Sequence, residues 1–64
     1  MKINQTKLEE LRVRRGLTQK ELAVKAGISR QWLSTVLLRR RATPEFAVKL
    51  ADALGVPLTE IIEK

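Results

Sequence analysis

Residues 19–37 read QKELAVKAGISRQWLSTVL, and this stretch decides the fold. It contains two helical patterns separated by a short turn around Gly27, a residue that permits a left-handed backbone. The small side chain of Ala23 lets the two helices approach each other closely. In the second helix, the apolar residues at i, i+3 and i+4 share one face: Leu33, Val36 and Leu37. The stretch predicts a helix-turn-helix, although an ordinary αα-corner has the same outline.

Helix start and stop signals divide the rest of the chain. Capping residues open four helices, two of them as capping boxes: Thr6 with Glu9, Thr18 with Glu21, Ser29, and Thr43 before Pro44. Glycines end three of these helices: Gly16, Gly27 and Gly55. After Pro57, three apolar residues predict a last short helix: Leu58, Ile61 and Ile62. The sequence therefore predicts an all-α fold of five helices, with residues 1–64 as a single domain.

Length and composition exclude several classes of protein. A chain of 64 residues buries only about 60% of the surface that its unfolded form exposes, which leaves room for one core. With neither Cys nor His, we expect no disulfide, no zinc site, no other metal and no cofactor. No apolar run approaches the roughly 20 residues that span a bilayer, and residues 1–10 lack a secretory pattern. We expect a cytoplasmic protein.

The charge of the chain points to a polyanionic partner. Thirteen basic residues against seven acidic ones give a net charge of +6. Residues 1–41 hold eleven basic and three acidic side chains, whereas residues 42–64 hold two basic and four acidic ones. One half of the domain therefore suits contact with nucleic acid. A generic solubilising charge is the alternative.

The outer face of the helix after Ser29 carries side chains that can read bases. A turn of 100° per residue places four hydrogen-bonding residues there or beside it: Arg30, Gln31, Ser34 and Thr35. Arg can grip guanine O6 and N7 together, Gln can grip adenine N6 and N7, and a hydroxyl can bond either. These four residues are the predicted base contacts, although Ser, Thr and Gln also occur on ordinary surfaces.

Several motifs resemble one family of small regulators. They are R-x-x-x-G-L-T-Q at 12–19, E-L-A at 21–23, A-G-I-S at 26–29 and L-A-x-A-L-G-V at 50–56. Together they resemble the Cro and phage-repressor (XRE-like) helix-turn-helix family over nearly the whole chain. The resemblance implies a sequence-specific regulator of transcription, most often a repressor, that binds double-stranded operator DNA as a two-fold dimer with its third helix in the major groove.

The resemblance and the basic residues also suggest which side chains contact the DNA backbone. The predicted phosphate contacts are Arg12, Thr18, Gln19, Ser29, Arg39, Arg40 and Arg41. The last three follow the recognition helix directly, so they can supply affinity that does not depend on base sequence. They can also be part of a solvated loop.

Three departures from the family pattern concern the end of the helix after Ser29, the partner of Arg12, and Trp32. Where many relatives carry an acidic residue and then Asn-Gly, this chain has Leu37, Leu38 and Arg39. Leu38 is either an exposed contact to thymine methyls and sugars or packs under the following loop. Without the acidic partner, Arg12 is either free for phosphate or unpaired. Trp32 is expected at the boundary of the core, half-buried, with DNA contact as the other possibility.

The apolar residues that the core least needs suggest a dimer surface, and the composition of the chain limits the competing functions. The apolar residues least needed by the core are Leu58 and Ile62, with Pro57 beside them, and they are the predicted dimer interface unless they pack inside. An antitoxin that also binds DNA is the alternative function, with a toxin as partner. Catalysis is not expected, because there is no His and no paired carboxylate in a pocket. We also expect no room for a small-molecule pocket, no membrane binding, and too few stacking aromatics for RNA.

Overall fold

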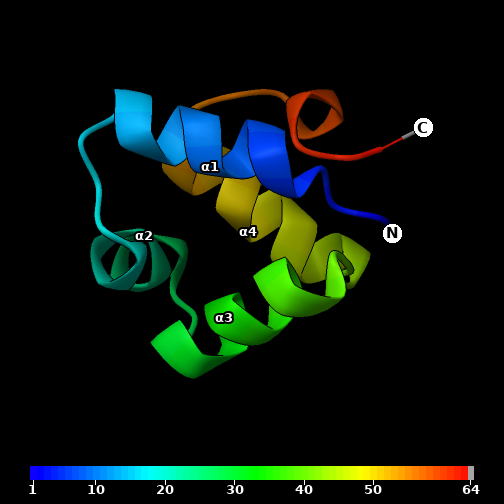
Figure 1. Ribbon diagram of the computed structural model, residues 1–64, viewed down its shortest axis with the longest axis horizontal. Helices are drawn as coiled ribbons and strands as arrows, with labels where there is room; N and C mark the ends of the chain where they lie inside the picture. Colours follow the sequence, from blue (N-terminus) through cyan, green and yellow to red (C-terminus); the bar gives the residue numbers. More distant parts are fainter. Residues whose placement is uncertain (64) are drawn as a thin grey trace.

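Four α-helices and one 3-10 turn form the computed structural model, which describes residues 1–63 (Figure 1). They are α1 (Gln5–Arg14), α2 (Gln19–Ala26), α3 (Arg30–Arg39), α4 (Pro44–Leu54) and the 3-10 turn η1 (Leu58–Glu60). The predicted all-α fold is confirmed, and residues 1–63 contain isolated β-bridges rather than strands. Among these helices, none has the length and apolar character required to cross a membrane.

The predicted fifth helix is wrong in kind, because only the three residues of η1 are helical and they form a single 3-10 turn. The physical reason lies in the next residues. Ile61 turns fully inward, and its carbonyl accepts a hydrogen bond from the Asn4 amide at 2.8 Å. The next residue, Ile62, forms a β-bridge with Ile3, and this pairing takes the chain out of the helix.

Most of the predicted caps are confirmed, and one is wrong. Side chains of Thr18, Ser29 and Thr43 accept hydrogen bonds from the amide three residues later, as N-caps do. The cap of α1 is Asn4, whose Oδ1 accepts from the Lys7 amide at 3.0 Å, so Thr6 lies inside the helix. Asn4 has the short polar side chain required and stands two residues earlier than Thr6.

The hydrophobic core is centred on α4. This helix packs against α2 and η1, while α2 packs against α3. Its inward face contributes five buried residues, namely Ala47, Leu50, Ala51, Ala53 and Leu54. Leucines from the three other helices close around it: Leu8, Leu11, Leu22, Leu33 and Leu37. The apolar periodicity therefore predicted the inward faces correctly.

Three short segments that are distant in sequence pair through their backbones, and we call them the terminal clasp: residues 1–3, 40–42 and 61–63. The amide of Ile3 donates to the Arg40 carbonyl at 2.8 Å, and that of Ala42 donates to the Met1 carbonyl at 3.0 Å. On the other side, the Glu63 amide donates to the Lys2 carbonyl at 3.0 Å. The clasp holds the end of α3 against both ends of the described chain.

Left-handed backbone ends α2 at Gly27, with φ of 74°. A Cβ built at this position meets nothing within 4 Å, so Gly27→Ala introduces backbone strain without a clash. We expect it to lower the free energy of unfolding by about 1–2 kcal/mol, which lowers the Tm by roughly 4–16 °C in a domain of this size. Thermal unfolding followed by circular dichroism measures the shift. Val24→Ala, at an exposed site on α2, is the control, and equal Tm values for the two variants would contradict the strain argument.

Candidate nucleic-acid interface

Side-chain caps set the orientation of the helix-turn-helix. Thr18 Oγ1 accepts from the Glu21 amide at 3.1 Å, and Glu21 Oε1 accepts from the Thr18 amide at 2.9 Å. The bond from the Thr18 backbone holds the pKa of the exposed Glu21 carboxyl below its usual value. Ser29 Oγ accepts from the Trp32 amide at 3.0 Å and so fixes the first turn of α3. Local sequence therefore fixes where both helices begin.

The predicted base-reading residues of α3 share an outward face. Arg30, Gln31 and Ser34 are exposed, and Thr35 is half-buried beside them. Thr35 Oγ1 donates to the carbonyl of Gln31 at 3.0 Å, so its lone pairs and methyl group remain available to a ligand. The structure thus brings four hydrogen-bonding side chains together on one helical surface, which is what reading of base edges requires.

Leu38 continues this face and is exposed to 84%. The alternative in which Leu38 packs under the following loop is therefore wrong. The helix ends at Arg39, and the C-cap residue Arg40 has a φ of 56°, which is left-handed without a glycine. The carbonyl of Arg40 is held by the Ile3 amide, so the clasp supports the stop that Asn-Gly gives to relatives.

The three arginines after α3 are not equivalent. Arg40 Nε donates to Gln5 Oε1 at 3.0 Å, which draws the Arg40 side chain toward the start of α1. Arg39 and Arg41 are exposed, and within residues 1–63 neither forms an ion pair or a hydrogen bond through its side chain. Their guanidinium groups are therefore available to an anion, whereas that of Arg40 is partly engaged.

Arg12 has partners within the protein. Its Nη2 lies 2.6 Å from Glu9 Oε2, and its Nη1 donates to the carbonyl of Leu17 at 2.7 Å. The alternative in which Arg12 is unpaired is wrong, because Glu9, one turn earlier, replaces the missing acidic partner. Its role as a phosphate contact stays a prediction. The i,i+3 spacing of Glu9 and Arg12 was the signal in the sequence that could have found this pair.

The remaining predicted phosphate contacts lie at helix starts. Thr18 and Ser29 are exposed N-caps, and Gln19 is the half-buried first residue of α2. Both hydroxyls accept a backbone hydrogen bond as caps, and each keeps its proton to donate elsewhere. The geometry is compatible with phosphate contact, and these roles stay predictions.

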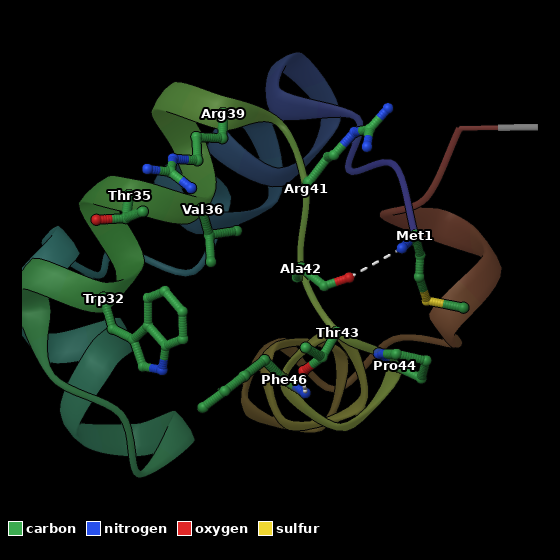
Figure 2. Close-up of a pocket in the computed structure, with 10 residues that line it drawn as sticks. All are labelled: Met1, Trp32, Thr35, Val36, Arg39, Arg41, Ala42, Thr43, Pro44 and Phe46. Carbon is green, nitrogen blue, oxygen red and sulfur yellow. Dashed lines mark hydrogen bonds between the residues drawn. The ribbon is translucent and has the colours of Figure 1, made fainter.

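Trp32 lies on the side of α3 that faces α4, at the boundary of the core as predicted, but it is exposed to 42% and so more open than the half-buried residue expected. Its ring meets the ring of Phe46 edge to face, with centroids 5.1 Å apart. Beside this pair lies a hollow of about 430 Å³ (Figure 2). The expectation of no room for a small-molecule pocket is therefore wrong. No local pattern indicated the hollow, because segments that are distant in the chain form it.

The predicted dimer residues lie near the C-terminal end of the described chain. Pro57 is exposed, while Leu58 and Ile62 are half-buried against the edge of the core. Ile62 also forms a β-bridge with Ile3. A part of each apolar side chain remains available for a partner, and their role in dimerisation stays a prediction.

Two helices are joined by a left-handed turn, the second helix carries an exposed row of hydrogen-bonding side chains, and exposed arginines follow it. These features define a helix-turn-helix DNA-binding protein. Comparison with known proteins agrees. A helix-turn-helix family model matches residues 8–61. The chain belongs to this family, the XRE or Cro type of DNA-binding transcriptional regulators.

Two solved structures are similar to this chain. The restriction-modification controller protein C.AhdI from Aeromonas hydrophila is 33% identical, with a TM-score of 0.79 over 88% of this chain and 86% of that one. A hypothetical transcription factor, NHTF from Neisseria, is 26% identical, with a TM-score of 0.77 over 94% of this chain and 78% of that one. Among curated proteins, no sequence matches this chain.

Proposed function

We propose that this protein is a sequence-specific transcriptional repressor of the cytoplasm that binds a pseudo-palindromic operator as a homodimer. In this proposal, residues 1–64 act as one domain and α3 lies in the major groove. The observation that carries it is the exposed row on α3, in which three neighbouring side chains have no structural role in the core: Arg30, Gln31 and Ser34. Repression follows from occupying the promoter, so no catalytic group is needed.

Base reading and phosphate binding fall to different residues in this proposal. Arg30, Gln31, Ser34 and Thr35 read base edges, with Leu38 beside them against thymine methyls or sugars. The phosphate contacts are Arg39 and Arg41, whose side chains are free of ion pairs within residues 1–63, together with the helix-start residues Thr18, Gln19 and Ser29. Arg40 contributes less, because its guanidinium already donates to Gln5.

Selection of binding sites from a pool of random duplexes tests this function. We expect a recovered consensus with two-fold symmetry and half-sites about 10 base pairs apart from centre to centre. Transcription in vitro from a promoter that contains the consensus then tests the sign of regulation, and repression is the expected result. A pool without enrichment over many rounds would contradict specific binding, and increased transcription would contradict repression.

The salt dependence of binding measures the phosphate contacts. If a dimer neutralises about six to eight phosphates, log K should fall against log salt with a slope of about −5 to −7. Replacing Arg39, Arg40 and Arg41 together by Gln should flatten the slope by about 2–5 units and leave the base preference unchanged. Lys7→Gln, on α1, is the charge control. A slope near zero for the unchanged protein would exclude DNA binding.

Dimerisation is tested at Leu58, which is half-buried in η1. Leu58→Glu should weaken operator binding by about tenfold or more, because a charge desolvated in an apolar interface is costly. The adjacent Thr59 is exposed, so Thr59→Glu is a matched control with the same added charge. Circular dichroism and sedimentation give helix content and oligomeric state. If Leu58→Glu unfolds the monomer, Leu58 belongs to the core and the dimer surface lies elsewhere.

An antitoxin that also binds DNA remains the alternative function. The likeness to a restriction-modification controller and to a transcription factor favours control of gene expression as the main role. Co-purification of a tightly bound toxin from the native host would favour the alternative.

A further inference from the structure

The hollow between α3 and α4 has the size of a ligand site. Its volume is about 430 Å³, and small-molecule sites in proteins typically measure about 300–1,000 Å³. Four segments build it: one face of α3, the link between α3 and α4 (residues 41–43), the start of α4, and the N-terminal residue held by the clasp (Figure 2). We call it the α3–α4 hollow. The base-reading proposal uses only one of its lining residues, Thr35.

The floor of the hollow is apolar and aromatic. The rings of Trp32 and Phe46 meet at 75°, and the side chains of Val36, Ala42 and Pro44 surround them. Trp32 leaves much of its indole open to solvent, although a side chain of this size usually buries most of its surface. The open part of the Trp32 indole, held beside the Phe46 ring by the edge-to-face contact, suits a flat aromatic group.

The rim of the hollow is cationic. Arg39 and Arg41 line it, and within residues 1–63 no carboxylate does. The nearest acidic side chain on α4, that of Glu45, is turned to Lys49, whose Nζ lies 3.9 Å from Glu45 Oε1 and 5.4 Å from the centre of the Phe46 ring. Figure 2 shows the two guanidinium groups pointing out of the hollow, one on either side of it. Within residues 1–63 no ion pair holds either group there, so each can turn inward to meet a negative charge placed above the apolar floor.

We infer that the α3–α4 hollow binds a planar aromatic carboxylate, and that this ligand competes with DNA phosphates for Arg39 and Arg41. The inference rests on the proposed function, because it assigns regulation to the same arginines. A phosphodiester engages the rim and leaves the aromatic floor uncovered. An aromatic carboxylate covers the floor with its ring and meets the rim with its charge. The ligand acts as an inducer, since DNA affinity falls when it is bound.

Binding to the isolated protein tests the site without DNA. The probe is 2-naphthoate, followed by 1H–15N spectra that include the indole N–H of Trp32, the only tryptophan of the chain. We expect shifts confined to residues that line the hollow and a Kd of about 0.02–1 mM, as its 13 non-hydrogen atoms allow. The neutral isostere 2-naphthamide should bind at least fivefold more weakly. Equal binding of the two probes, shifts elsewhere, or no shift at 5 mM would overturn the inference.

Different variants test the contribution of the cationic rim and that of the aromatic floor. Arg39→Gln and Arg41→Gln should each weaken 2-naphthoate binding by about threefold to tenfold and leave 2-naphthamide binding unchanged. Phe46→Leu should weaken both probes, because it removes the ring that packs against Trp32 and lines the hollow. Lys25→Gln is the matched control on α2, since Lys25 does not line the hollow, and it should change neither. Helix content of every variant is checked by circular dichroism, and loss of both probes in a folded Arg39→Gln variant would overturn the charge assignment.

Competition with DNA tests the second part of the inference, that the ligand lowers DNA affinity. At 5 mM 2-naphthoate, binding of the selected operator should fall by about threefold or more, whereas 5 mM 2-naphthamide should have little effect. If the hollow binds 2-naphthoate and operator affinity does not change, the second part of the inference is wrong and the DNA-binding function stands. If the protein binds no duplex at all, the proposed function fails, and the ligand site is still judged by the spectra.

Discussion

Gln31→Ala is expected to weaken binding to the selected operator by about 5- to 150-fold and to leave affinity for random duplex nearly unchanged. Gln31 is exposed in the first turn of α3 and has a planar amide that can bond adenine N6 and N7 together. A bidentate contact is worth about 1–3 kcal/mol against the correct base, and each 1.4 kcal/mol is tenfold in affinity. Dissociation constants for both duplexes at one salt concentration measure the effect.

The neighbouring Arg30 provides the comparison. Arg30→Ala should give the same specific loss together with a small loss on random duplex that grows at low salt, because it also removes a positive charge. Val24→Ala, at an exposed position of α2, should change neither constant. If Gln31→Ala weakens both duplexes equally, Gln31 contacts the backbone and not a base, and its assignment in the proposed interface is wrong.

Leu33→Ala should lower the free energy of unfolding by about 2–5 kcal/mol, whereas Leu38→Ala should change it by less than about 0.5 kcal/mol. Both leucines belong to α3, but Leu33 is fully buried and Leu38 is exposed to 84%. A domain of 64 residues has a total stability of only about 3–10 kcal/mol, so Leu33→Ala brings it close to unfolding. Urea titration followed by circular dichroism measures both changes.

The same two variants separate stability from recognition. If Leu38 touches thymine methyls or sugars, Leu38→Ala should weaken operator binding while the protein keeps its stability. Unchanged operator affinity would remove Leu38 from the interface. A loss of stability as large as that of Leu33→Ala would contradict the exposure of Leu38 in the monomer and point to a surface that is covered in the dimer.

Features that depend on neighbouring residues were predictable from the sequence. N-caps and left-handed glycines act within a single turn, so Thr18, Ser29, Thr43, Gly27 and Gly55 could be placed correctly. The inward faces of the helices follow from apolar spacing in the same way. The outward row on α3 is the complement of its inward face and was predicted for that reason.

The sequence-based predictions failed where two nearby residues suit the same role, or where contacts between distant segments determine the local structure. Thr6 and Asn4 both suit the start of α1, and spacing alone does not choose between them. Arg12 had Glu9 one turn away, a local partner that the family pattern hid. The last helix became a 3-10 turn because Ile61 and its neighbours pair with the N-terminal backbone, and the α3–α4 hollow likewise needs residues about 40 positions apart.

The terminal clasp also has a consequence for the order in which the molecule forms. It joins backbone groups separated by about 40 and 60 positions, and closing such long loops costs more entropy than forming the helices or the α2–α3 turn. The clasp therefore closes late in folding, after α2, α3 and α4 have met. Since it holds Arg40 and Arg41, the basic end of the recognition helix reaches its final position only when the whole chain has folded. We therefore expect an incompletely folded chain to lack an ordered basic segment after α3, the segment to which the proposed function assigns phosphate contact.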